Sequence, residues 1–287
     1  MTDSPRMLRR VAIPLHMLSL LVAACSADPI PKAWLGNWQV DAVLIDGGAT
    51  RTLHYQHDDD RLKGRMVALG PGELTTDLPE DKRCGRPSVT SRRTTAGALI
   101  RDTMAHRGSA PVTPTPGDYE LGLASSAPVE VWQIDCADGG MGPAGRENGT
   151  WIVALPGGKL AMRWYDETIL RLTRVPENAK PSPSFDCAKA TLPAEKAICA
   201  SRSLAAFDRS VAASYSFVTR HLTELDDTDT LKRVQNSQRA WLQKRNTCAA
   251  DPACLEKSMD SRVKFAFALS VITTPGDTTL QRILFLP

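Results

Sequence analysis

The hydrophobic pattern of the chain changes period at residues 176–184, Pro-Glu-Asn-Ala-Lys-Pro-Ser-Pro-Ser. Before this stretch apolar side chains alternate with polar ones, as in β-strands. After it they recur every three or four residues, as in amphipathic helices. A run of strands followed by a run of helices argues for separate domains, and prolines favour an extended spacer between them. The pattern therefore predicts an α+β chain with two domains, a β domain over residues 34–175 and a helical domain over residues 185–272.

The β domain is predicted to be a small antiparallel barrel, because its strand-like segments are short and separated by turns. The segments are residues 38–44, 62–69, 119–123, 129–134, 151–155, 160–164 and 169–175. One helix is expected at Thr95–Arg107, where apolar residues fall at helical spacing. Gly-Asn-Trp at residues 36–38 resembles the Gly-x-Trp signature of lipocalins. That resemblance implies a lipocalin-like barrel, whose cup either takes an apolar ligand or, in a domain this small, is filled by side chains.

The helical domain is predicted to hold three amphipathic helices. The first begins near Ala194 and carries an apolar stripe at steps of three and four residues. The stripe consists of Leu204, Phe207, Val211, Tyr215, Val218 and Leu222. A polar break at Glu224–Thr230 follows, with Thr228 or Asp229 as the cap of a second helix. The second helix is expected over residues 231–245 and the third over residues 255–269.

Of the seven cysteines, Cys25 stands apart, and the even set that remains predicts disulfides in an exported chain. The others are Cys84, Cys136, Cys187, Cys199, Cys248 and Cys254. Many pairings are open to such a set, and position along the chain favours Cys84–Cys136, Cys187–Cys199 and Cys248–Cys254. A zinc site is the alternative. It is disfavoured because the spacing lacks paired Cys-x-x-Cys knuckles and no histidine lies nearby.

The N-terminal segment is predicted to be a secretory signal peptide at residues 1–24. Basic residues precede an apolar run that is too short for a comfortable membrane span. The small residues before Cys25 resemble a bacterial lipobox, which implies cleavage at this cysteine and diacylation of its thiol as a lipid anchor. The alternative is ordinary cleavage near the same place, with Cys25 left free. Ser26 favours the outer membrane by analogy with enteric bacteria, and residues 25–33 are then a lipidated tether.

The C-terminal part of the sequence is similar to a known lipoprotein family. The shared features are the cysteine framework, Leu-Ala-x-x-Asp-x-x-Val-x-x-x-Tyr from Leu204, Gln-Arg-x-Trp-Leu-x-x-Arg-Asn-x-Cys from Gln238, and the later pairs Cys254-Leu255 and Arg262-Val263. Together they resemble the LprI family, named for a mycobacterial lysozyme-inhibitor lipoprotein. Met259 departs from the pattern, since the family usually has tyrosine there. The resemblance implies inhibition of lysozyme but supplies no contact residues.

Candidate partner-binding residues come from the break between the first two helices and from the second helix. The break carries four acids that suit a basic protein partner, such as an animal-type lysozyme. These are Glu224, Asp226, Asp227 and Asp229. The alternative is an ordinary helix connection. Arg239 and Arg245 are candidate cationic contacts, although an internal, hydrogen-bonded arginine beside a packed Trp241 is the favoured use of such residues.

The sequence predicts no catalytic, cofactor or metal site. It has no Gly-x-Ser-x-Gly elbow and no clear nucleophile–base pair. His54, His57 and Asp58–Asp60 lack the ligand spacing of a calcium loop, so a solvated hairpin loop is favoured there. The charge pattern shows no clustered basic face of the kind that binds nucleic acid.

The resulting hypothesis is a bacterial envelope lipoprotein that binds a protein partner without catalysis, with a lysozyme inhibitor as its specific form. The alternative hypothesis is an outer-membrane, lipocalin-like carrier of a small apolar ligand; an envelope enzyme is the least favoured. The tail at residues 273–287 contains an apolar run and is expected to pack on one of the domains.

Overall fold

The computed structural model describes residues 30–49, 53–104, 113–145 and 149–272. The predicted signal peptide, the predicted anchor Cys25 and the tail lie outside these residues. The structure is mixed α+β, with eight strands followed by the long helices. The strands are β1 Gly36–Leu44, β2 Met66–Leu69, β3 Glu73–Thr76, β4 Arg83–Thr95, β5 Pro128–Gly139, β6 Trp151–Leu155, β7 Lys159–Arg163 and β8 Ile169–Arg174. The α-helices are α1 Ala96–Met104, α2 Pro193–Ala200, α3 Arg202–Glu224, α4 Thr228–Asn246 and α5 Pro252–Ile272.

The eight strands form one antiparallel sheet in chain order. Strand β1 also pairs with β8, so the sheet closes into a barrel. Trp38 of β1 lies opposite Val67 of β2 on one side and opposite Arg174 of β8 on the other. Closure removes the free strand edges that an open sheet would present. The antiparallel sheet expected from the alternating pattern is therefore confirmed.

Side chains from all eight strands meet in one buried cluster inside the barrel. Trp38 and Trp164 are among its largest members, with exposures of 2% and 0%. The indole of Trp38 donates to the carbonyl of Trp34 at 2.8 Å, so its polar edge is also satisfied. Packing of this kind corresponds to the filled form of the barrel and argues against an open cup.

A second buried cluster lies on the opposite face of the strands, where α1 packs. Successive side chains of a strand point to opposite faces. On β6, Ile152 accordingly belongs to the interior cluster, whereas Trp151 and Val153 belong to the second one. Leu99 and Ile100 of α1 are buried in this second cluster. The helix expected in this region is confirmed over Ala96–Met104.

The strand predictions were wrong in two places. Residues 62–64 form a turn and Arg65 has no regular structure, so β2 begins only at Met66. Residues 119–123 form turns and loop, and Tyr119 is nevertheless buried, because it packs in the second cluster and its hydroxyl donates to the Glu167 carbonyl at 3.1 Å. Strands β3 and β4 were not predicted. Most residues of β4 are exposed on both faces, so it lacks the apolar alternation that marks a half-buried strand.

The helical part differs from the prediction at two helix starts. Ser201 divides the expected first helix into α2 and α3, and its hydroxyl accepts from the Leu204 amide at 3.3 Å as an N-cap. Asp227 caps α4 in place of the expected Thr228 or Asp229, since its carboxylate accepts from the Thr230 amide at 3.0 Å. Among the described helices, none combines the length and apolarity that a membrane crossing requires.

The three predicted disulfides are confirmed. Cys84–Cys136 joins β4 to β5 within the barrel. Cys187–Cys199 ties the chain before α2 to that helix, and Cys248–Cys254 closes the turn between α4 and α5. The helical part has two small buried clusters, and short covalent links stabilise such thin cores.

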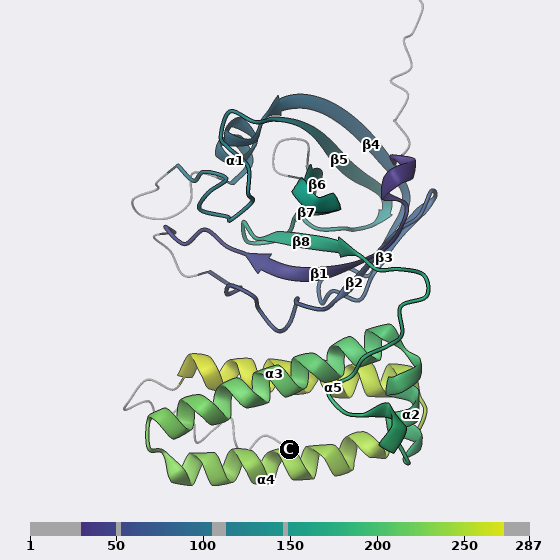
Figure 1. The fold of residues 1–287 in the computed structure, drawn as a ribbon, viewed down its shortest axis with the longest axis vertical. Coiled ribbons are helices and arrows are strands. Elements are labelled where there is room, and N and C mark those ends of the chain that lie inside the picture. Colours follow the sequence, from purple (N-terminus) through teal and green to yellow (C-terminus); the bar gives the residue numbers. More distant parts are fainter. Residues whose placement is uncertain (1–29, 50–52, 105–112, 146–148, 273–287) are drawn as a thin grey trace, which may run out of the picture.

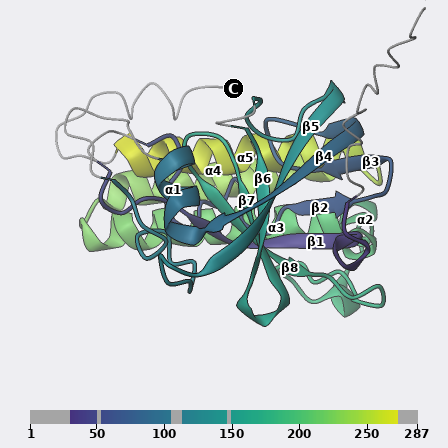
Figure 2. The same ribbon diagram turned by 90° about the horizontal axis from the view of Figure 1, so that it is seen from above.

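The barrel lies over α3 and α5, with α4 on the far side (Figure 1), and its strands cross above the helical layer (Figure 2). Arg65, just before β2, is 0% exposed at this contact. Its Nη2 donates to the Ser210 hydroxyl at 2.6 Å, and its guanidinium lies 3.5 Å from the centre of the Phe207 ring. The Nε and Nη1 atoms of Arg65 are buried without a hydrogen-bond partner. The barrel and helices are thus joined by a polar contact as well as by the chain.

Two further hydrogen bonds cross the same contact. The Ser203 hydroxyl donates to Asp77, and the Ser214 hydroxyl donates to Asp60 at 2.9 Å. An exposed ion pair between Lys82 and Glu256, at 3.3 Å, lies at its margin. These bonds join residues more than 120 positions apart in the chain, with separations of 126 and 154 for the two serine bonds.

The stretch predicted as a spacer is fastened to α3. Arg202 donates from Nε to the Ala179 carbonyl at 2.9 Å, and Arg209 donates to the Ser182 carbonyl. Asp208 accepts from both the amide and the hydroxyl of Ser184, at 2.7 and 2.6 Å. Residues 176–184 therefore run along the helix and do not hang free between the two parts.

Candidate functional site

The acidic break between α3 and α4 is exposed, as a docking loop requires. Glu224, Asp226 and Asp229 are exposed. Asp226 has a φ of 54°, in the left-handed region, and this conformation turns the chain between the two helices. Three of the four predicted acids therefore present their carboxylates to solvent.

Asp227, the fourth acid, has a structural role. Its bond to the Thr230 amide satisfies one of the free donors at the start of α4 and lowers the pKa of the carboxyl. A carboxylate at this position also suits the positive end of the helix dipole. Asp227 therefore serves as the N-cap of α4.

Arg245 lies inside the helical bundle. It is 5% exposed, its Nη1 lies 3.5 Å from Oδ1 of Asp208, and its guanidinium lies 5.5 Å from the centre of the Trp241 ring. Burial lowers its pKa, and the negative charge of Asp208 opposes that shift. Because Asp208 also holds Ser184, this pair joins α3, α4 and the preceding segment. The internal use favoured from the sequence agrees with this position.

Arg239 is the candidate cation that the structure leaves on the surface. It is exposed, and its guanidinium donates to the side chain of Asn236 on the same helix. Its neighbour Gln238 accepts from Arg262 at 2.8 Å, and the Trp241 indole donates to the Ser258 carbonyl at 3.3 Å. Within the motif from Gln238 to Cys248, Gln238, Trp241 and Arg245 therefore hold α4 against the rest of the bundle.

The acids before β2 are not the solvated loop that the sequence favoured. Asp59 is 0% exposed and accepts from the amide and guanidinium of Arg61, with an ion-pair distance of 2.6 Å. Asp60 faces Ser214 of α3, and burial raises its pKa. The prediction failed for Asp60 because its partner Ser214 comes 154 positions later on α3, which no local pattern reveals.

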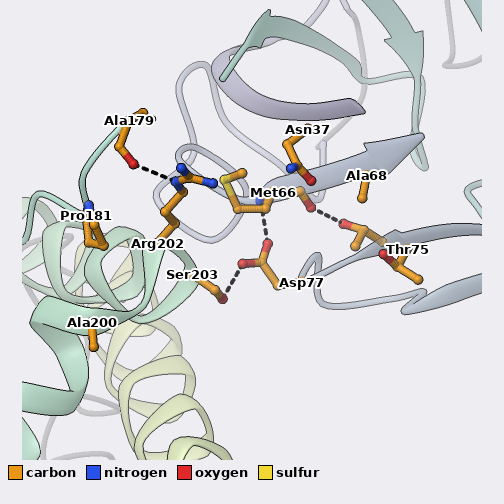
Figure 3. Close-up of a pocket in the computed structure, with 11 residues that line it drawn as sticks. Asn37, Met66, Ala68, Thr75, Asp77, Ala179, Pro181, Ala200, Arg202 and Ser203 are labelled. Carbon is orange, nitrogen blue, oxygen red and sulfur yellow. Dashed lines mark hydrogen bonds between the residues drawn. The ribbon is translucent and has the colours of Figure 1, made fainter. Parts of the chain in front are cut away.

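A pocket of about 540 Å³ opens between the outer face of β1–β3, the segment before α2, and the start of α3 (Figure 3). Asp77 is its central polar group. One carboxylate oxygen accepts from the Met66 amide at 2.5 Å, and the other accepts from the Ser203 hydroxyl. Burial raises the pKa of Asp77, while the nearby positive charge of Arg65 opposes the shift.

The polar groups of this pocket are hydrogen-bonded to one another and so hold the barrel against the helices. Both oxygens of Asp77 are engaged, and Arg202 is turned toward the Ala179 carbonyl (Figure 3). Among the eleven residues that line the pocket there is no histidine or lysine that could act as a base and activate the Ser203 hydroxyl. Sequence reasoning missed Asp77, Ser203 and Arg65. The only hint was charge within a predicted strand, since Lys63 and Arg65 interrupt the apolar residues of 62–69.

Comparison with protein-family models, with curated proteins and with solved structures gives no match. The likeness to the LprI family therefore remains a prediction from the motif.

Proposed function

We propose that this chain is a bacterial envelope lipoprotein that binds a basic protein partner without catalysis, with lysozyme as the specific partner to test. The proposal includes the signal peptide, the lipid anchor at Cys25, the outer-membrane location and the LprI-like helical domain. It also includes a lipocalin-like assignment of the barrel and the division into two domains. Disulfides at all three predicted pairs support an oxidising compartment such as the periplasm.

The observation that carries the proposal is the exposed acidic break between α3 and α4, on a bundle whose Gln238, Trp241 and Arg245 are used internally. Arg245 is buried in the bundle, and Trp241 is half-buried with its indole bonded to the Ser258 carbonyl, so both are poor candidates for contact with a protein partner. Glu224, Asp226 and Asp229 keep their carboxylates in solvent at one end of that bundle. Clustered charge of one sign steers a partner of the opposite sign and raises the association rate.

The packed barrel weighs against the alternative of a small-ligand carrier. A carrier needs an internal space lined by apolar groups, whereas the interior positions of this barrel are occupied by mutually packed side chains. The barrel is better suited to act as a rigid support, which holds the helical part through Arg65 and Asp77.

A cell-wall lysis assay tests the proposal. The mature soluble chain, starting after Cys25, is expected to slow lysozyme, and a variant with Glu224→Gln, Asp226→Asn and Asp229→Asn is expected to inhibit about tenfold less well. The matched control neutralises three exposed acids elsewhere, Asp102→Asn, Glu130→Gln and Glu177→Gln. An equal loss of inhibition in both triple variants would contradict the proposal, as would no inhibition by the native chain at large molar excess.

A further inference from the structure

A second pocket lies between α4 and α5, away from the acidic loop. Its volume is about 660 Å³, within the range of roughly 300–1,000 Å³ that small-molecule sites occupy. The rings of Trp241 and Phe265 form its apolar part, and serine and threonine side chains contribute polar groups. Lys244 and Lys257, both exposed, lie among its lining residues.

Arg262 supplies the buried charge of this pocket. It is only 8% exposed, and its guanidinium lies 4.7 Å from the centre of the Phe265 ring and 5.8 Å from that of Trp241. Its Nε donates to Gln238 at 2.8 Å and its Nη1 donates to the Ser237 hydroxyl at 3.0 Å. Both acceptors are neutral. Within the described part of the chain, Nη2 of Arg262 makes no hydrogen bond and the guanidinium makes no ion pair.

A buried cation without a counterion is costly, and proteins usually pair it. Arg245, on the neighbouring helix, follows that rule through Asp208. Arg262 does not, and burial lowers its pKa to about 10, so it still carries its charge at neutral pH. Lys244 and Lys257 likewise have no ion-pair partner among the residues that the structure describes. Three positive groups without an ion-pair partner among the described residues therefore line one pocket that also offers two aromatic rings.

We propose that this pocket binds a monomeric amphiphile with an anionic head, either a carboxylate or a phosphate. The head pairs with the guanidinium of Arg262 and with the rim lysines, because a charge-assisted bond is the strong interaction that this group lacks. The aliphatic or aromatic body lies on Trp241 and Phe265, which removes apolar surface from water. The proposal is independent of the acidic loop and of its protein partner.

Calorimetric titration of the full mature chain tests the proposal with single-chain probes below their micelle concentrations. Laurate and dodecyl phosphate are expected to bind at least about tenfold more tightly than neutral dodecyl maltoside or cationic dodecyltrimethylammonium. Acetate and inorganic phosphate, which carry the head without the chain, are expected to show no measurable binding. Equal affinity for the anionic and neutral probes would overturn the charge recognition, and binding of the small anions alone would overturn the role of the rings.

Substitutions in the pocket then test where the ligand binds. Arg262→Gln is expected to lower laurate affinity about tenfold, and Lys244→Gln with Lys257→Gln a few-fold. The matched control is Lys196→Gln with Lys232→Gln, two exposed lysines that do not line the pocket. If Arg262→Gln fails to fold, the double variant Lys244→Gln with Lys257→Gln and the series of probes still test whether this pocket binds the amphiphile. Unchanged affinity in the rim pair, or an equal loss in the control pair, would contradict the site. The triple acidic-loop variant is expected to bind laurate normally, which separates this proposal from the proposed function.

Discussion

Replacing Arg245 by methionine is expected to destabilise the chain and so to distinguish a structural arginine from a contact residue. The side chains of Arg245 and Asp208 are 6% and 7% exposed, with an N–O distance of 3.5 Å. Removing one partner of a buried pair leaves the other charge uncompensated, which costs roughly 3–5 kcal/mol. Asp208 keeps two hydrogen bonds from Ser184, so the lower end, about 3 kcal/mol, is expected.

Thermal unfolding followed by circular dichroism measures this loss. In a chain of this size each 1 kcal/mol shifts Tm by roughly 2–4 °C, so Arg245→Met is expected to lower Tm by about 6–12 °C. Arg239→Met is the matched control, because Arg239 is exposed on the same helix and should cost less than about 0.5 kcal/mol. A variant Arg245→Met that keeps native stability while losing partner binding would refute the structural assignment. Coupling between Arg245→Met and Asp208→Asn in a double-mutant cycle would support it.

Three further outcomes follow from the same structure. Asp227→Ala is expected to cost about 1 kcal/mol, because it removes the cap of α4, whereas Asp229→Ala should be close to neutral in the same chemical-denaturation experiment. Replacing the Cys84–Cys136 pair by alanines should cost about 4 kcal/mol and the Cys248–Cys254 pair about 2 kcal/mol, since the sequence separations are 52 and 6; an inverse order would contradict the loop-entropy reasoning. Burial raises the pKa of Asp60 above its ordinary 3.8, so the folded state binds that proton more tightly and the ionised carboxyl opposes folding at neutral pH. The stability of Asp60→Asn relative to the native chain should therefore be greatest near neutral pH and should decline as pH falls through the raised pKa toward 3.8; a difference that is constant with pH would argue against it.

Local pattern predicted the elements that carry regularly spaced apolar residues. Alternation located β1 and β5–β8, and the stripe from Leu204 located α3. The same reasoning missed β4, whose side chains are mostly exposed on both faces, and it extended one helix through Ser201, where a hydroxyl cap starts a new one. The spacing of apolar residues alone cannot distinguish one long helix from two consecutive helices whose apolar residues continue the same spacing.

The contact between barrel and helices was beyond sequence reasoning for a different reason. Asp60 lies in a polar stretch whose local sequence suggests solvent, and Arg65 lies in a run of mixed apolar and charged residues. Their partners Ser214 and Ser210 come 154 and 145 positions later. Their burial results from the docking of α3, which is a tertiary event. For the candidate site, the sequence locates the acidic break, and only the structure separates the cap Asp227 from its exposed neighbours.

Hydrogen–deuterium exchange of the mature chain with and without bound lysozyme tests the central claim most directly. The account predicts slowed exchange at the amides of residues 223–230, with exchange in the barrel and in the pocket between α4 and α5 unchanged. Protection confined to the barrel, or the absence of any protection at lysozyme concentrations that inhibit fully, would contradict the account.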